Sequence, residues 1–124
     1  MLSHVIHLMS LTDTYKVWTA DQINRCVVPP VNLHQCTGIF EDGYLVAWVS
    51  WAWMDRENAS KFLDGCYTMS PESWSSGDEL VFMDCIAPFG HVRELMRICR
   101  QLFPHYNKAQ WRRHIKEKRV GVNL

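Results

Sequence analysis

Apolar residues recur at helical spacing near both ends of the chain. In residues 3–11 they fall on one face, which predicts a short opening helix with Ser3 as its cap. In residues 92–103 they recur every three or four positions while arginines occupy the polar side. Pro104 follows, and because proline cannot continue the hydrogen-bond ladder, we expect the second helix to end there.

Two further helices are indicated by their capping residues. Thr19 and Gln22 have the spacing of a capping box, so a helix is predicted from Thr19 onward, and we expect the prolines at 29 and 30 to end it. Asp55 can cap a helix that runs to about residue 63, with Gly65 supplying the left-handed stop. Both helices follow from local signals alone.

Three stretches favour strands. Residues 33–40 and 44–53 flank Asp42-Gly43, a strong hairpin turn signal. Residues 80–87 read as a mostly buried strand with a single charge, and a last strand is predicted at 110–115 before the end frays. The order helix, helix, hairpin, helix, strand, helix, strand predicts an α/β (α+β) fold: a mixed sheet flanked by helices, similar to GCN5-related acetyltransferases.

Composition limits the architecture to one domain. With 124 residues and 48% hydrophobic content, the chain supports a single core, so we treat residues 1–124 as one domain. No apolar run reaches the roughly 20 residues that span a bilayer, and the start lacks the features of a signal peptide, so we expect a cytoplasmic protein. The five cysteines show no CxxC spacing and are predicted to be reduced thiols.

A longer motif indicates a family. Residues 74–90, W-S-S-G-D-E-L-V-F-M-D-C-I-A-P-F-G, closely resemble the signature of the toxin-activating lysine acyltransferases, of which the hemolysin-activating enzymes are the best known. S-W-A-W at residues 50–53 and the Pro-Pro before the hairpin also look like that family, and the resemblance extends over about residues 4–104. It implies a GCN5-related fold and transfer of a fatty acyl group from acyl carrier protein to a lysine ε-amine of a protein.

The resemblance also implies site residues. Family members are thought to use one histidine and one aspartate, and the aspartate corresponds to Asp84. The histidine position is occupied by Tyr15, and typical members continue well beyond residue 124. His4 and His7 lie close in sequence and could replace the histidine, although helix histidines are more often packing or surface residues. Tyr15 could donate a hydrogen bond to the oxyanion, but a phenol is a poor base at neutral pH.

The chemistry of amine acylation supports a role for Asp84. A lysine is almost fully charged at neutral pH, so a group must accept its proton, and a carboxylate at the end of a buried strand is suited to that task. We expect Phe82 and Ile86 to be its apolar neighbours. The alternative is a buried acid paired with an arginine such as Arg93. Cys85 next to it could be a thiol nucleophile, but strand alternation turns it to the opposite face and favours a core role.

The turn after this strand is the predicted donor site. A helix that opens just after Gly90 offers free N–H groups to an oxyanion or to the phosphate of the donor, whereas a simple helix entry is the alternative. His91 could act as a substitute base or a phosphate ligand, or simply face solvent. The Gly-rich loop of acetyl-CoA enzymes is absent, which favours a carrier-protein donor over acyl-CoA or acetyl-CoA. The expected donor-binding residues are Phe89, Gly90, His91, Val92 and Arg93.

Charge is distributed unevenly, which bears on partners. Residues 41–84 are strongly acidic and residues 93–124 strongly basic, although the formal net charge is zero. The basic end is either a solvated strand edge or a dock for an acidic partner such as acyl carrier protein. Nucleic acid is not favoured because no recognition motif accompanies the charges. His34 and Cys36 are too close together for a standard zinc site, and we predict no metal.

Two classes of function therefore remain open. The first is a protein-lysine acyltransferase acting on a protein substrate, with an acetyl-CoA-dependent acetyltransferase as its variant. The second is a catalytically inactive interaction or inhibitor protein, of the kind a phage can encode, that keeps the fold. A homodimer is compatible with either class.

Overall fold

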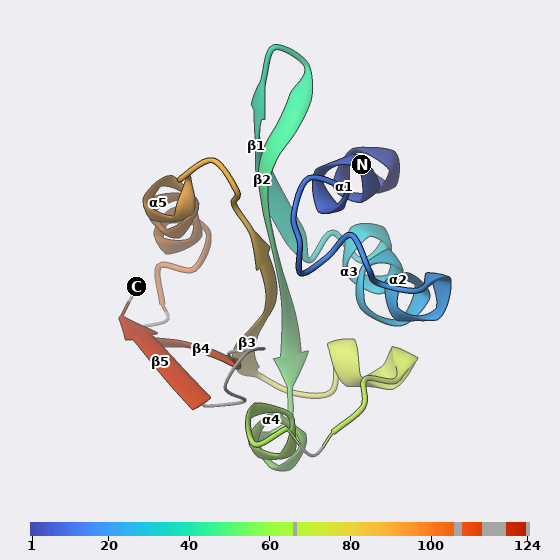
Figure 1. Ribbon diagram of the computed structural model, residues 1–124. Helices are drawn as coiled ribbons and strands as arrows, with labels where there is room; N and C mark the ends of the chain where they lie inside the picture. Colours follow the sequence, from blue (N-terminus) through green and yellow to red (C-terminus); the bar gives the residue numbers. More distant parts are fainter. Residues whose placement is uncertain (66, 106–107, 113–118, 124) are drawn as a thin grey trace.

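The computed structural model describes residues 1–65, 67–105, 108–112 and 119–123, and a mixed sheet organises them (Figure 1). Figure 1 shows α5 on one side of this sheet and α1, α2 and α3 on the other. The elements in chain order are α1 (Leu2–Met9), α2 (Ala20–Cys26), α3 (Val28–Asn32), β1 (Cys36–Glu41), β2 (Tyr44–Met54), α4 (Arg56–Leu63), the 3-10 helix η1 (Pro71–Trp74), β3 (Glu79–Ile86), α5 (Val92–Leu102), β4 (Lys108–Arg112) and β5 (Arg119–Asn123).

The sheet has five strands in the order β1-β2-β3-β4-β5. Neighbouring strands are antiparallel except β3 and β4, which run parallel through Val81 with Gln110 and Phe82 with Trp111. The predicted mixed sheet flanked by helices is thus confirmed. The last predicted strand is observed at Lys108–Arg112, and residues 113–115 of that prediction lie outside the described residues. Strand β5 was not predicted.

The hairpin and α4 form where the local signals place them. Asp42 and Gly43 have φ angles of 51° and 82°, so both adopt the left-handed conformation that a two-residue type I′ turn requires. Asp55 caps α4 by accepting a hydrogen bond from the backbone N–H of Asn58 at 2.8 Å. Gly65, just beyond the helix, has a φ of 80°. These three predictions are confirmed.

The N-terminal helices differ in detail from the prediction. The capping box of Thr19 and Gln22 is present, but α2 ends at Cys26, ahead of the two prolines. The prolines instead lie in the first turn of α3, where an N–H group would have no intrahelical partner, so they begin a helix rather than end one. Helix α1 begins at Leu2 without a side-chain cap, so the prediction that Ser3 caps it is wrong.

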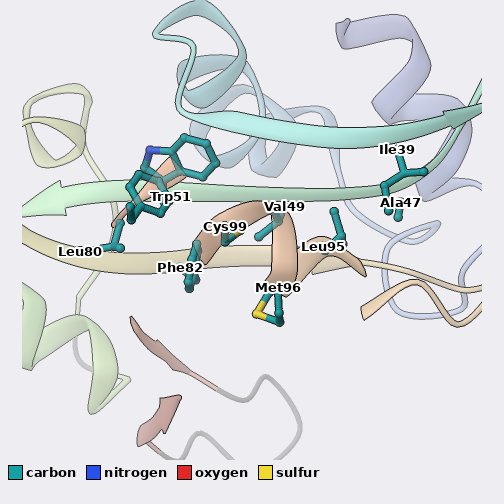
Figure 2. Packing of buried hydrophobic residues seen from close by; sticks show 10 residues of the cluster. Ile39, Ala47, Val49, Trp51, Leu80, Phe82, Leu95, Met96 and Cys99 are labelled. Carbon is teal, nitrogen blue, oxygen red and sulfur yellow. The ribbon is translucent and has the colours of Figure 1, made fainter. Parts of the chain in front are cut away.

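Each face of the sheet has its own core. On the α5 face, β1, β2 and β3 contribute apolar side chains that pack against Leu95, Met96 and Cys99 of the helix (Figure 2). On the opposite face, one cluster gathers around α4 and another around α1. The α1 cluster consists of Val5, Leu8, Met9, Tyr15, Val27, Leu45, Trp48 and Ile86.

A β-bulge interrupts the alternation of β3. Ser50 pairs with Asp84, but the next residue of β2, Trp51, pairs with Phe82, so Met83 is one residue too many on β3. Phe82 consequently packs on the α5 face and Met83 in the α4 cluster on the other. The expectation that Phe82 is an apolar neighbour of Asp84 is therefore wrong, because it assumed strict alternation.

Candidate active site

Asp84 lies in the interior on the sheet face that carries α1. Only 5% of this residue is exposed to solvent. The hydroxyl of Tyr15 donates a hydrogen bond to Oδ1 of Asp84 at 2.9 Å, although the two residues are 69 positions apart in the chain. The bulge explains this placement, because it directs Met83 and Asp84 to the same face. The structure therefore brings together two of the predicted site residues.

Tyr15 belongs to the segment between α1 and α2 and is itself buried. Burial, and secondarily the carboxylate of Asp84, raises the pKa of the Tyr15 phenol far above its ordinary value of 10.0. Tyr15 is therefore a protonated hydrogen-bond donor at neutral pH, and its hydrogen is directed at Asp84. A role as donor to an oxyanion stays a prediction, and it would require the hydroxyl to turn away from the carboxylate.

Tyr15 also lines a surface pocket of about 120 Å³. Its walls come from α1, from α2 and from the segment that joins them, and Lys16 at this pocket pairs with Asp13 at 2.8 Å. The hydroxyl of Tyr15 bonds Asp84, and its ring packs against Trp18, another residue of the pocket, with centroids 4.9 Å apart. Tyr15 thus connects the pocket with the buried carboxylate. The pocket is lined by Ile6, Met9, Ser10, Tyr15, Lys16, Trp18 and Ile23.

Ser50 is a site residue that the sequence interpretation did not single out. It is completely buried and faces Asp84 across the β2–β3 pair. Among the residues the structure describes, its Oγ atom has no hydrogen-bond partner. One signal was available: apart from Tyr44 at its first position, Ser50 is the only residue of β2 with a side-chain hydroxyl, amide or charge.

The structure places His4 and His7 against the hairpin. Both are exposed residues of α1. The ring of His4 meets that of Phe40 edge-on at 5.2 Å, and the ring of His7 lies 6.1 Å from that of Tyr44. Neither ring contact involves the Asp84–Tyr15 pair, and a role for His4 or His7 in place of the family histidine stays a prediction.

The predicted donor site forms an exposed turn at the start of α5. Phe89 is 56% and Val92 is 43% exposed, and Arg93 is exposed as well. Gly90 has a φ of 91° with open space around its Cα, so the turn favours glycine for its backbone conformation. Nε2 of His91 lies 3.0 Å from Oε1 of Glu41, which ties the turn to β1. These residues lie together, while α5 packs on the face opposite Asp84.

The cysteine next to Asp84 has the character of a core residue. Cys85 packs with the cluster on the α5 face, opposite to Asp84 as predicted. Burial, and then the charge of Asp84, raises the pKa of its thiol to about 11, so a thiolate nucleophile is disfavoured at neutral pH. The described cysteines, Cys26, Cys36, Cys85 and Cys99, are free thiols, and Cys66 lies outside the described residues.

The described residues contain no group of three or more His, Cys, Asp or Glu side chains that could hold a metal ion. Within the same part of the chain, no helix is both long and apolar enough to cross a membrane.

Comparison with known proteins identifies relatives along nearly the whole chain. The sequence model described as "HlyC: RTX toxin acyltransferase family" matches residues 1–122. The leukotoxin-activating lysine-acyltransferase LktC of Mannheimia haemolytica (serotype A1) is 28% identical over 121 residues, which are 98% of this chain and 72% of LktC.

Two further relatives are more similar over a shorter stretch. The leukotoxin-activating lysine-acyltransferase LtxC of Aggregatibacter actinomycetemcomitans is 33% identical over 105 residues, or 85% of this chain and 62% of LtxC. The protein-lysine myristoyltransferase HlyC of Escherichia coli is 34% identical over 104 residues, or 84% of this chain and 60% of HlyC. Asp84, Tyr15 and Ser50 all lie within the residues that the family match covers.

Proposed function

The chain belongs to the RTX toxin acyltransferase family, and on that premise we propose that it transfers a fatty acyl group from a carrier thioester to the ε-amine of a lysine in a protein substrate. The observation that carries this proposal is the buried pair of Asp84 and Tyr15, in which Tyr15 both bonds the carboxylate and lines a surface pocket. The names of the relatives agree, since they are lysine acyltransferases and, in two cases, activate a leukotoxin.

Asp84 acts as the proton acceptor in this reaction, and Tyr15 holds it in place. The lysine ammonium first releases one proton to solvent, and the neutral amine nitrogen then attacks the thioester carbonyl carbon; a C–N bond forms, and the tetrahedral intermediate expels the carrier sulfur as the C–S bond breaks. The second proton of the nitrogen passes to Asp84 and then to the leaving thiolate, so the products are an amide, a free thiol and the proton released to solvent. Because Tyr15 keeps its own proton at neutral pH, it is a positioning residue.

The donor is acyl carrier protein, with acyl-CoA as the alternative. The exposed turn at Phe89–Arg93 supports this assignment, since α5 starts there without a side-chain cap and the backbone N–H groups of its first turn are suited to a phosphate. The basic C-terminal residues favour an acidic carrier, and such a donor would place the reaction in the cytoplasm. A homodimer is compatible with this scheme and is tested by light scattering of the purified protein.

The direct test is the mass of a protein substrate. The full chain is incubated with a recombinant leukotoxin fragment and either myristoyl-acyl carrier protein or myristoyl-CoA, and peptide mass spectrometry locates the modified lysine. Myristoylation of a lysine with either donor is the expected result, and the faster donor identifies the physiological class. No mass increase with either donor, at enzyme concentrations equal to those of the substrate, would refute the proposal.

A second candidate function is favoured by one residue. Tyr15 occupies the position where the family resemblance implies a histidine, so the chain could bind acyl carrier protein or a toxin without catalysis. In that case the wild type and an Asp84→Asn variant would bind a partner equally well in calorimetry, and neither would modify it.

A further inference from the structure

The hydroxyl of Ser50 occupies an unusual place in the core. Its residue is fully buried, and no described residue offers it a hydrogen bond. An unpartnered buried hydroxyl costs about 1–3 kcal/mol, so such groups are rare and call for an explanation. Ser73, the other fully buried serine, shows the usual pattern: its Oγ bonds the Tyr67 hydroxyl at 2.6 Å and accepts from the Ser70 backbone N–H at 3.0 Å.

Ser50 points to the same side of the sheet as Asp84. Trp48 and Ala52, its neighbours two positions away on β2, pack in the clusters of the α1 face, whereas Val49 and Trp51 pack on the α5 face. Ser50 and Asp84 are direct cross-strand partners, and such partners on one face have Cβ atoms about 5 Å apart. An atom that reaches the carboxylate of Asp84 is therefore within reach of the Ser50 hydroxyl.

Acyl transfer needs a hydrogen-bond donor for the oxygen of the tetrahedral intermediate, and the donors near Asp84 differ in their availability and position. The Tyr15 hydrogen is bonded to Asp84 itself. The helix start after Gly90 belongs to α5, which packs on the opposite face. The indole N–H groups of Trp48 and Trp74 on this face are, like the Ser50 hydroxyl, buried without a hydrogen-bond partner among the described residues. Of these three donors, Ser50 is the one whose residue pairs directly with Asp84 across the strands.

We infer that Ser50 is a catalytic residue whose hydroxyl donates a hydrogen bond to the carbonyl oxygen of the acyl thioester and to the oxyanion formed from it. Asp84 accepts the proton of the attacking amine on one side of the carbonyl, and Ser50 stabilises the charge on the other. The inference rests on the proposed acyltransferase function. It further requires the Tyr15 segment to move aside, because Asp84 and Ser50 are both buried and Tyr15 is bonded to Asp84.

The test is Ser50→Ala in the full chain, assayed for lysine myristoylation of a leukotoxin fragment. We expect kcat to fall about 100-fold with little change in KM, as for loss of one oxyanion donor. The thermal midpoint should stay the same or rise, because the substitution removes an unpartnered buried hydroxyl. Ser50→Cys, similar in size but a poor donor, should lose nearly as much kcat. Ser73→Ala is the matched control and should lower the thermal midpoint while kcat of the folded protein is retained.

The possible outcomes distinguish the inference about Ser50 from the proposed acyltransferase function on which it rests. If the wild type transfers the acyl group and Ser50→Ala does so within twofold of its kcat, the inference is wrong and the proposed function stands. The same conclusion follows if Ser50→Ala lowers the thermal midpoint and raises KM alone, since the hydroxyl would then be structural. A wild type that transfers nothing would refute the proposed function and the inference with it.

Discussion

The two faces of the sheet carry cores of different character. On the α5 face, Val49, Phe82 and Leu95 belong to a continuous apolar cluster in which every member is hydrophobic. On the opposite face, the α1 cluster adjoins a buried carboxylate, a buried phenol and a buried serine hydroxyl: Asp84, Tyr15 and Ser50. The same two central strands build both faces, so the difference arises from which residues alternate to each side.

The comparison separates stability from chemistry. Apolar packing on the α5 face lowers the free energy of the folded chain, and large-to-small substitutions there cost about 2–5 kcal/mol. Buried polar groups on the α1 face cost free energy unless they are fully hydrogen-bonded. We therefore expect substitutions on the α5 face to reduce the stability of the protein. Replacement of the buried polar residues on the α1 face should instead reduce its activity.

The largest effect is expected from Asp84→Asn. The amide keeps the shape of the side chain and can still accept the hydrogen bond from Tyr15, but it does not accept a proton. The rate of lysine acylation should fall about 10²- to 10⁴-fold, with a thermal midpoint within a few degrees of the wild type. Asp78→Asn, at an exposed position, is the control and should leave the rate unchanged. An Asp84→Asn protein with wild-type activity would contradict the assignment of catalysis to the α1 face.

The next effect concerns the α5 face. Leu95 is fully buried, and Leu95→Ala should lower the free energy of unfolding by about 2–5 kcal/mol in urea titrations. Leu102→Ala in the same helix, where the side chain is about half exposed, should change it by less than about 0.5 kcal/mol. The acylation rate per folded molecule should be retained in both variants. A folded Leu95→Ala protein with a strongly reduced rate would show that the α5 face also serves catalysis.

Tyr15→Phe should reduce both the stability and the activity of the protein, each by a smaller amount than the preceding substitutions. It removes a hydrogen bond to a buried carboxylate, so the free energy of unfolding should fall by roughly 1.5–3 kcal/mol. The rate should fall less than in Asp84→Asn, since the phenol orients the base without accepting the proton. Tyr44→Phe, at an exposed tyrosine of the hairpin, should change neither quantity. If Tyr15→Phe abolished activity as completely as Asp84→Asn, the phenol would itself contact the substrate.

The smallest effect is a pH dependence located on the α5 face. Burial raises the thiol pKa of Cys85 and of Cys99 to about 11, from the ordinary value of 9.0 that applies in the unfolded chain. Between about pH 9 and 11 the unfolded state loses these protons first, so stability that is fully present below pH 9 is lost as the pH rises. A Cys85→Ala/Cys99→Ala variant should show a shallower loss in urea midpoints across this window. Identical slopes would show that the thiols do not contribute.

Local sequence signals predicted much of the fold. Asp42-Gly43 specified the hairpin, and Thr19 and Asp55 specified the starts of two helices, because turns and caps depend on a few adjacent residues. The prolines at 29 and 30 were misread, since proline is compatible with the first turn of a helix as well as with the end of one. Strand β5 had no clear pattern of its own and depends on pairing with β4.

The site was predictable only in part. Asp84 was found through the family signature, and Tyr15 as the residue in the histidine position. Their hydrogen bond depends on tertiary packing, and periodicity does not report contacts across 69 residues. The true position of Phe82 was missed because a bulge shifts the alternation by one residue and no residue type at Met83 signals it. Ser50 was missed because its pairing with Asp84 depends on the register between β2 and β3, which the sequence does not report.

The extra residue at Met83 has a consequence for engineering. Deleting it would leave strict alternation along β3 and keep the present orientations: Phe82 would still pair with Trp51 and face α5, and Asp84 would still pair with Ser50 on the α1 face. The loss would be the packing of Met83 in the α4 cluster. Deletion of Cys85 has no such compensation, because it would turn a neighbouring residue of β3 to the wrong face. In libraries of this protein, a single-codon deletion at residue 83 should therefore be better tolerated than one at residue 85.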